Sequence, residues 1–224
     1  MISFEVSAVR GEEHRPVDFV LELADVAGPG IGGEDVERLA INAVDFLLVA
    51  LRGLMGEGEL EPLRAAQLAR LGPRVGDLVW DIGCGSGAFA TEAARAGAAV
   101  IAVDRDLRAC ERTEANARAF GLQVQIVAGT APHVLENLPE PDVVRVGGGG
   151  VAVVSAVADR RPQRIVAHAA TRDEAELVGR DLTEHGYRVE CALLQSVELD
   201  TRAWTETERS VAFLLSGVLP DRTV

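Results

Sequence analysis

Apolar and polar positions follow two alternating patterns from Val75 to the end of the chain. Short apolar runs of strand length are separated by segments whose apolar residues recur every three or four positions, which is the helical period. The apolar runs predict strands over 77–82, 98–103, 123–128, 142–147, 164–169, 188–195 and 211–217. The helical spacing predicts helices over 86–96, 107–120, 132–138, 150–159 and 172–186. Strand–helix alternation of this kind is typical of a doubly wound α/β sheet whose strands are mostly parallel.

The last two predicted strands are connected differently. The segment 197–209 between them is polar and too short for a helical crossover, so we interpret it as a loop and expect these two strands to pair antiparallel. The result is a seven-stranded sheet with an antiparallel last strand.

Residues before Val75 follow another pattern. Two short extended segments are predicted before residue 30, and Glu34 to Leu54 has the apolar spacing of an amphipathic helix. A second short helix is expected from about Pro62 to Leu71. We therefore divide the chain into an N-terminal acidic extension, 1–57, and an α/β domain, 58–224.

A glycine-rich turn follows the first strand of that domain. The stretch from Leu78 to Ala88 reads LVWDIGCGSGA, with glycines at 83, 85 and 87 and an acid at Asp81. Glycines at a strand-to-helix turn let a ligand approach the backbone closely. The next strand ends at Asp104, where a carboxylate is placed to accept both hydroxyls of a ribose. We interpret the pair as one nucleotide-binding βαβ unit.

The spacing D-x-G-x-G-x-G resembles motif I of class I S-adenosylmethionine (SAM)-dependent methyltransferases. It differs from the G-x-G-x-x-G that accommodates a pyrophosphate. The acid suits a cationic ligand such as SAM. An NAD-type turn, or a glycine turn without a ligand, stays open at this point. The predicted SAM-binding residues are Asp81, Gly83, Gly85, Ser86, Gly87, Asp104, Arg105, Gly129, Thr130, Ala131 and Gly147.

The roles of Asp106 and Arg145 can each be interpreted in two ways. Asp106 could simply N-cap the helix that follows it. Arg145 falls inside the fourth strand, VVRV, and we favour a snorkelling edge residue there over a carboxylate binder.

The strings DIGCGSG, AVDRD, GTAP and LPEPDVVRVGGGG, at these intervals, resemble the CbiT-type precorrin methyltransferases, which also form the C-terminal half of CobL-type precorrin-6Y C5,15-methyltransferases. The similarity covers roughly residues 58–217. It implies the class I methyltransferase fold, a SAM-dependent methylation of a ring carbon in a precorrin-6-type macrocycle, coupled loss of carbon dioxide from an acetate side chain, and a homo-oligomer, typically a tetramer. Arg64 matches an arginine of that family and His168 stands where the family has Asn, so both are candidate catalytic residues.

The macrocycle carries many carboxylates, and arginines are expected to anchor them; the candidates are Arg64, Arg105 and Arg172. His168 could be a general base, could orient a carboxylate, or could be structural.

Composition and charge indicate which classes of substrate, partner and compartment to expect. The net charge is −13, so we expect a small tetrapyrrole substrate and no nucleic acid, which needs a basic surface. No apolar run reaches the roughly 18 residues of a membrane span. We expect no signal peptide, because the first residues carry acids and lack a basic segment followed by an apolar core. The cysteines at 84, 110 and 191 fit neither a disulfide framework nor a metal site, so we expect a cytoplasmic protein without a metal.

Two alternative functions remain. One is a class I methyltransferase for another small molecule or for a tRNA adenine. The other is a diverged, non-catalytic SAM-binding subunit, because Glu59 and Leu60 occupy the positions of a Thr-Lys pair in the family.

Overall fold

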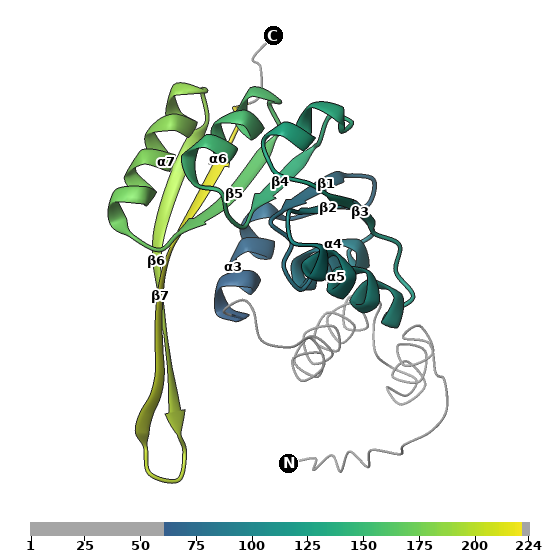
Figure 1. Cartoon of the computed structure of the whole chain (residues 1–224). Coiled ribbons are helices and arrows are strands. Elements are labelled where there is room, and N and C mark those ends of the chain that lie inside the picture. The colour runs from purple at the N-terminus through teal and green to yellow at the C-terminus, as the bar shows by residue number, and fades with distance from the viewer. Residues whose placement is uncertain (1–60, 221–224) are drawn as a thin grey trace, which may run out of the picture. The chain divides into compact units, whose positions relative to one another are not determined.

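Strands and helices alternate from β1 to α7 in the structure, a computed structural model that describes residues 61–220 (Figure 1). The strands are β1 (Leu78–Ile82), β2 (Ala99–Asp104), β3 (Gln125–Ala128), β4 (Val143–Val146), β5 (Arg164–Ala169), β6 (Arg188–Asp200) and β7 (Thr205–Val218). The helices are α3 (Glu61–Leu71), α4 (Ala88–Arg95), α5 (Leu107–Ala119), the 3₁₀-helix η1 (His133–Asn137), α6 (Gly150–Asp159) and α7 (Arg172–Glu184). The predicted extended segments, the helix from Glu34 to Leu54 and the domain boundary at residue 57 lie outside the described residues.

The strands form one seven-stranded sheet in the order β3-β2-β1-β4-β5-β7-β6. Strands β1 to β5 are parallel, and β7 is antiparallel to both β5 and β6. The carboxyl ends of the parallel strands therefore meet at one edge, and the order reverses between β1 and β4. The predicted fold class, a class I methyltransferase-like doubly wound sheet, is confirmed.

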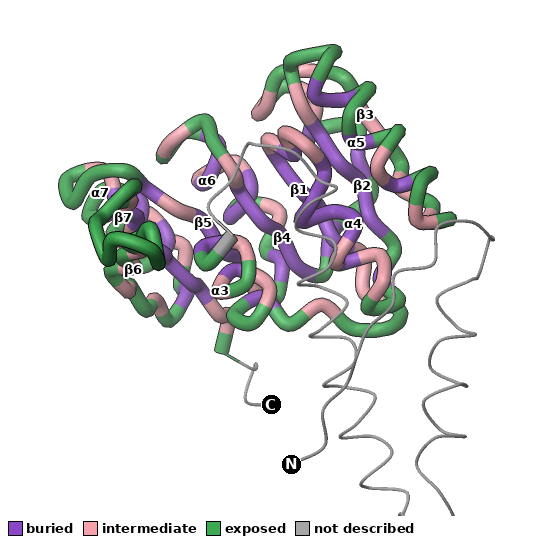
Figure 2. The backbone as a smooth tube through the Cα atoms, turned by 90° about the horizontal axis from the view of Figure 1, so that it is seen from below, coloured by how far each residue is buried: buried purple, intermediate pink, exposed green. Residues whose placement is uncertain are grey.

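Helices cover both faces of the sheet, and the side chains of each strand alternate between them. Trp80 and Ile82 of β1 belong to the apolar cluster under α6 and α7. Val79 belongs to the cluster under α3 and α4. Because parallel strands are buried on both faces, the central strands are buried almost throughout, as Figure 2 shows. Even the acid at position 81 is enclosed.

The segment interpreted as the loop 197–209 is mostly strand, which corrects that prediction. β6 and β7 remain paired from Arg188↔Val218 out to Asp200↔Thr205. β7 pairs with β5 only from Phe213 to Val218, so the rest of the hairpin is a two-stranded arm that extends past the sheet (Figure 1). Its polar residues suggested a loop, but a ribbon with water on both faces carries polar side chains without penalty. The threonines and valines within it have high strand propensity.

Within residues 61–220, no helix combines the length and hydropathy that a membrane span requires. The same stretch holds no group of three His, Cys, Asp or Glu side chains arranged to bind a metal ion.

Candidate active site

The turn after β1 is a tight backbone turn pressed against the turn after β4. Gly83 has φ 76°, and its N–H donates to the Val103 carbonyl at 2.7 Å. A Cβ built on Gly83 would lie 3.3 Å from the carbonyl carbon of Gly147, so the two turns leave almost no room for a side chain between them. Glycine is needed here both for the positive φ and for this close approach.

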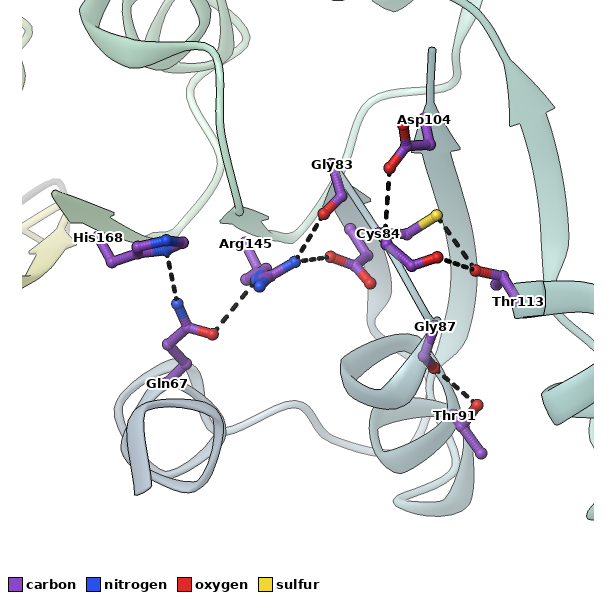
Figure 3. Close-up of polar contacts among 11 residues, drawn as sticks. Gln67, Gly83, Cys84, Gly87, Thr91, Asp104, Thr113, Arg145 and His168 are labelled. Carbon is purple, nitrogen blue, oxygen red and sulfur yellow. Dashed lines mark hydrogen bonds and ion pairs between the residues drawn. The ribbon is translucent and has the colours of Figure 1, made fainter. Parts of the chain in front are cut away.

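Asp104, at the carboxyl end of β2, is tied to the glycine turn. Its Oδ2 accepts from the Gly85 N–H at 3.0 Å (Figure 3). Its Oδ1 accepts from the Asp106 N–H at 2.9 Å. A carboxylate has about four lone-pair positions, so the Asp104 carboxylate has further acceptor capacity. Asp106 does N-cap α5, accepting from the Arg108 N–H at 3.0 Å. The two neighbouring acids thus have separate roles.

A cavity of about 250 Å³ lies at the carboxyl ends of the strands, where the strand order reverses. Ligands bind at this place in open α/β sheets. Six of the predicted SAM-binding residues line it: Gly83, Asp104, Arg105, Gly129, Thr130 and Ala131. The glycine-rich turn after β4 contributes Gly148 and Gly149.

The other predicted residues shape the turn without lining the cavity. The Ser86 carbonyl accepts from Asn116 Nδ2 at 2.7 Å, and the Gly147 N–H donates to the Ile82 carbonyl at 2.6 Å. The Gly85 N–H donates to Asp104, and Gly87 is the N-cap residue of α4 with φ 76°. These residues act through the shape of the backbone.

The side chain of Asp81 is fully buried and faces Arg145. Arg145 Nη1 donates to Asp81 Oδ1 at 2.9 Å and to the Gly83 carbonyl at 3.0 Å. Only 3% of Arg145 is exposed, and its guanidinium lies 5.5 Å from the Phe89 ring centroid. The prediction that Arg145 snorkels at a sheet edge was wrong, because β4 is a central strand with no solvent on either side. Arg145 therefore links the Asp81 carboxylate to the glycine turn after β1.

The two candidate catalytic residues have different hydrogen-bond partners. Arg64 Nε donates to Glu92 Oε1 at 3.1 Å, which ties α3 to α4. His168, at the end of β5, contacts Gln67 of α3 at 3.2 Å. Arg172 is exposed at the start of α7. Of the three candidate anchors, Arg105 is the one that lines the cavity.

Gln67 was missed by the sequence prediction, although a signal existed. It follows Leu63 and precedes Leu71 at steps of four residues, so it lies on the apolar stripe of its helix. All three side chains are buried, and Gln67 is 0% exposed. A polar residue on an apolar stripe must find partners inside the protein.

Cys84 is not a nucleophile. Burial, together with the nearby Asp81 charge, raises the pKa of its thiol to about 12. The thiol therefore stays protonated near neutral pH.

Gly85 and Gly87 offer a matched test of how closely the turn after β1 packs against α5. A Cβ on Gly87 would lie 2.6 Å from Thr113 Cγ2 and 2.8 Å from Thr113 Cα, whereas a Cβ on Gly85 meets nothing within 4 Å. Both have positive φ, so each Ala substitution carries a strain of about 1–2 kcal/mol. We expect Gly87→Ala to lose roughly a further 1–3 kcal/mol through overpacking, measured by urea unfolding without ligand. Equal losses in the two variants would contradict the Gly87–Thr113 contact.

Comparison with known proteins identifies the relatives of the chain. A family model described as precorrin methyltransferase domain matches residues 56–212. The precorrin-6Y C(5,15)-methyltransferase [decarboxylating] of Mycobacterium tuberculosis is 34% identical over 151 residues, which cover 61% of this chain and 38% of that protein. A probable cobalt-precorrin-6B C(15)-methyltransferase (decarboxylating) of Pyrobaculum calidifontis is 39% identical over 112 residues, covering 46% and 57%. The chain thus matches only part of the length of these two curated relatives.

A solved structure agrees with this. The C-terminal domain of precorrin-6Y C5,15-methyltransferase from Rhodobacter capsulatus superposes with a TM-score of 0.62 at 32% identity. The alignment covers 73% of this chain and 93% of that domain.

Proposed function

Because the chain belongs to the precorrin methyltransferase domain family, we propose that it transfers a methyl group from SAM to a ring carbon of a precorrin-6-type macrocycle. The observation that carries the proposal is the cavity at the strand reversal, where Asp104 and the glycine turns after β1 and β4 meet. Coupled loss of carbon dioxide from an acetate side chain is part of the proposal, in line with the names of both curated relatives.

The residues present fit SAM. The acceptor capacity of Asp104 suits the two hydroxyls of a ribose, and the glycine turns let a ligand lie against the backbone. Thr130 and the backbone of Gly129 and Ala131 border the same cavity and suit an adenine edge. When bound, SAM supplies a methyl group on a cationic sulfur, and the chain contributes mainly orientation and exclusion of water.

A carboxylate-rich macrocycle needs cationic anchors at the mouth of the crevice. Arg105 lines the cavity and is exposed, and Arg172 is exposed at the start of α7 beyond the end of β5. Guanidinium groups bind carboxylates bidentately, so we assign Arg105 to the substrate, whereas Arg172 lines the hollow between α7 and the sheet. The net charge of −13 supports a small molecule over RNA as substrate.

A mass-spectrometric turnover assay tests the function. The purified chain is given SAM and a reduced precorrin-6 substrate, alone and together with a separate C5-methylating enzyme. A gain of one methyl group with loss of carbon dioxide is the expected result. SAM binding without any change in substrate mass would contradict the proposal and leave a non-catalytic SAM-binding subunit.

We further propose that the chain forms a homo-oligomer through the β6–β7 arm. An isolated two-stranded ribbon is marginally stable in water, and both edges of the arm are open in the described chain. One face of the arm and of its base exposes apolar side chains: Leu193, Val197, Leu199 and Val211, between 40% and 59% exposed. This face continues the hollow between α7 and the sheet, whose floor includes Val189 and Phe213. Contact with a second copy of the chain would bury this apolar face.

Leu193→Glu is expected to convert the oligomer to a smaller species, because it places a charge opposite Phe213 on this face. Light scattering after size-exclusion chromatography measures the change in mass. Ser196→Glu is the control, since it lies on the opposite face of the same strand. An unchanged mass for Leu193→Glu would exclude this part of the arm from the interface.

A further inference from the structure

Four side chains from separate elements form a continuous polar chain on the α3 side of the sheet (Figure 3). Asp81 and Arg145 are register partners on β1 and β4, and His168 lies further along the neighbouring β5. Strand alternation turns all three toward the face that α3 covers, where Gln67 lies between Arg145 and His168. Gln67 and Asp81 are fully buried, so a donor that faces a donor, or an acceptor that faces an acceptor, would lower the stability of the fold.

The orientation of the Gln67 amide follows from Arg145. A guanidinium only donates hydrogen bonds, and Arg145 Nε lies 3.2 Å from Gln67 Oε1. The amide oxygen must therefore face Arg145, and the amide NH₂ must face His168. Arg145 is itself held by Asp81 and by the Gly83 carbonyl, so it cannot easily turn away. The ion pair between Asp81 and Arg145 thus determines which atom donates and which accepts in each following hydrogen bond.

The amide in turn fixes the imidazole. Gln67 Nε2 lies 3.2 Å from His168 Nδ1, and a donor there requires Nδ1 to be the acceptor. The other neutral tautomer and the imidazolium would both oppose two donors at this contact. We propose that Gln67 and Arg145 are positioning residues that hold His168 as the neutral tautomer with its proton on Nε2.

The tautomer has a consequence for the reaction, which rests on the proposed function. With the proton on Nε2, His168 presents an N–H donor and cannot accept a proton at that atom. Acceptance at Nδ1 would break the bond to Gln67. The general-base role considered from the sequence is therefore disfavoured, because neither ring nitrogen accepts a proton without loss of this arrangement.

Nitrogen-15 NMR of the full chain tests the tautomer directly. The sequence contains four histidines, and the His168→Asn variant identifies the resonances of residue 168 by their loss. Spectra are recorded at pH 8, above the ordinary imidazole pKa of about 6.5. We expect Nδ1 at the shift of an unprotonated nitrogen and Nε2 at that of a protonated one. The reverse pattern in the wild-type chain would overturn the proposal.

Two variants of Gln67 test the cause. In Gln67→Glu one carboxylate oxygen still accepts from Arg145, but the other now accepts from His168, so the Nδ1 resonance is expected to move to the protonated shift. In Gln67→Met the constraint disappears, and averaged shifts of mixed tautomers are expected. Gln163→Glu, at an exposed position whose amide donates to the Leu219 carbonyl, is the matched control and should leave His168 unchanged.

Unchanged His168 shifts in a folded Gln67→Glu or Gln67→Met chain would overturn the proposal. If Gln67→Glu does not fold, the wild-type pattern and Gln67→Met still decide it. The measurement needs neither SAM nor a precorrin, so its outcome is distinguishable from failure of the proposed function.

Discussion

Asp104→Asn is expected to weaken SAM binding at least about 100-fold. The substitution removes the charge and replaces one acceptor oxygen with a donor at the end of β2, where Oδ1 and Oδ2 already accept from two backbone N–H groups. Hydrogen bonds to a charged group contribute about 1.5–3 kcal/mol each, and about 1.4 kcal/mol corresponds to tenfold in affinity. Loss of one such bond to a ribose hydroxyl, together with weakening of the other to a bond with a neutral acceptor, accounts for the expected size. Isothermal titration calorimetry with SAM measures it.

Asp106→Asn is the matched control for this variant. Asp106 lies two residues away and caps α5, and Asn is an equally good N-cap, so neither SAM affinity nor stability should change appreciably. Unfolding of both variants without SAM separates loss of binding from loss of the turn. An Asp104→Asn protein that is folded and binds SAM like the wild type would show that this carboxylate does not contact the ribose.

Arg145→Met is expected to destabilise the fold by about 3–5 kcal/mol. The variant leaves the buried Asp81 carboxylate without the guanidinium that neutralises it, and removing one partner of a buried ion pair has a cost of this order. The Gly83 carbonyl loses a donor as well. Urea unfolding monitored by circular dichroism measures the difference.

Two further variants test the origin of this effect. Arg145→Met combined with Asp81→Leu should recover much of the lost stability, because replacing both partners by apolar side chains is often close to neutral. Arg118→Met removes an exposed pair with Glu114 and should change stability little. A loss for Arg145→Met no larger than for Arg118→Met would show that the buried pair is not needed for stability.

The sequence predicted the parts of this molecule that depend on local patterns. Strand and helix positions, the parallel order and the residues gathered at the strand ends follow from hydrophobic period and from the rule that parallel strands end at one edge. The cavity around Gly83, Asp104 and Thr130 was therefore predictable. These features need no knowledge of which side chains meet across the core.

The remaining features depend on long-range pairing. Arg145 was misread because a single charged residue in an apolar run does not reveal that its partner, Asp81, lies 64 positions earlier. Gln67 was missed because its two partners lie in β4 and β5. The arm was misread because its strand pairing continues where neither face is buried, so the alternation that marks strands is weak there.

The buried pair also bears on how the sheet chooses its alignment. β1 and β4 are central strands with apolar residues on both faces, so hydrophobicity alone distinguishes poorly between neighbouring registers. Asp81 lies directly opposite Arg145 in the observed register. A shift of β4 by one residue would turn the guanidinium into the apolar cluster under α6 and α7, and a shift by two would separate the charges along the strands. The ion pair therefore favours a single alignment of β1 and β4, the two strands that end in the glycine turns.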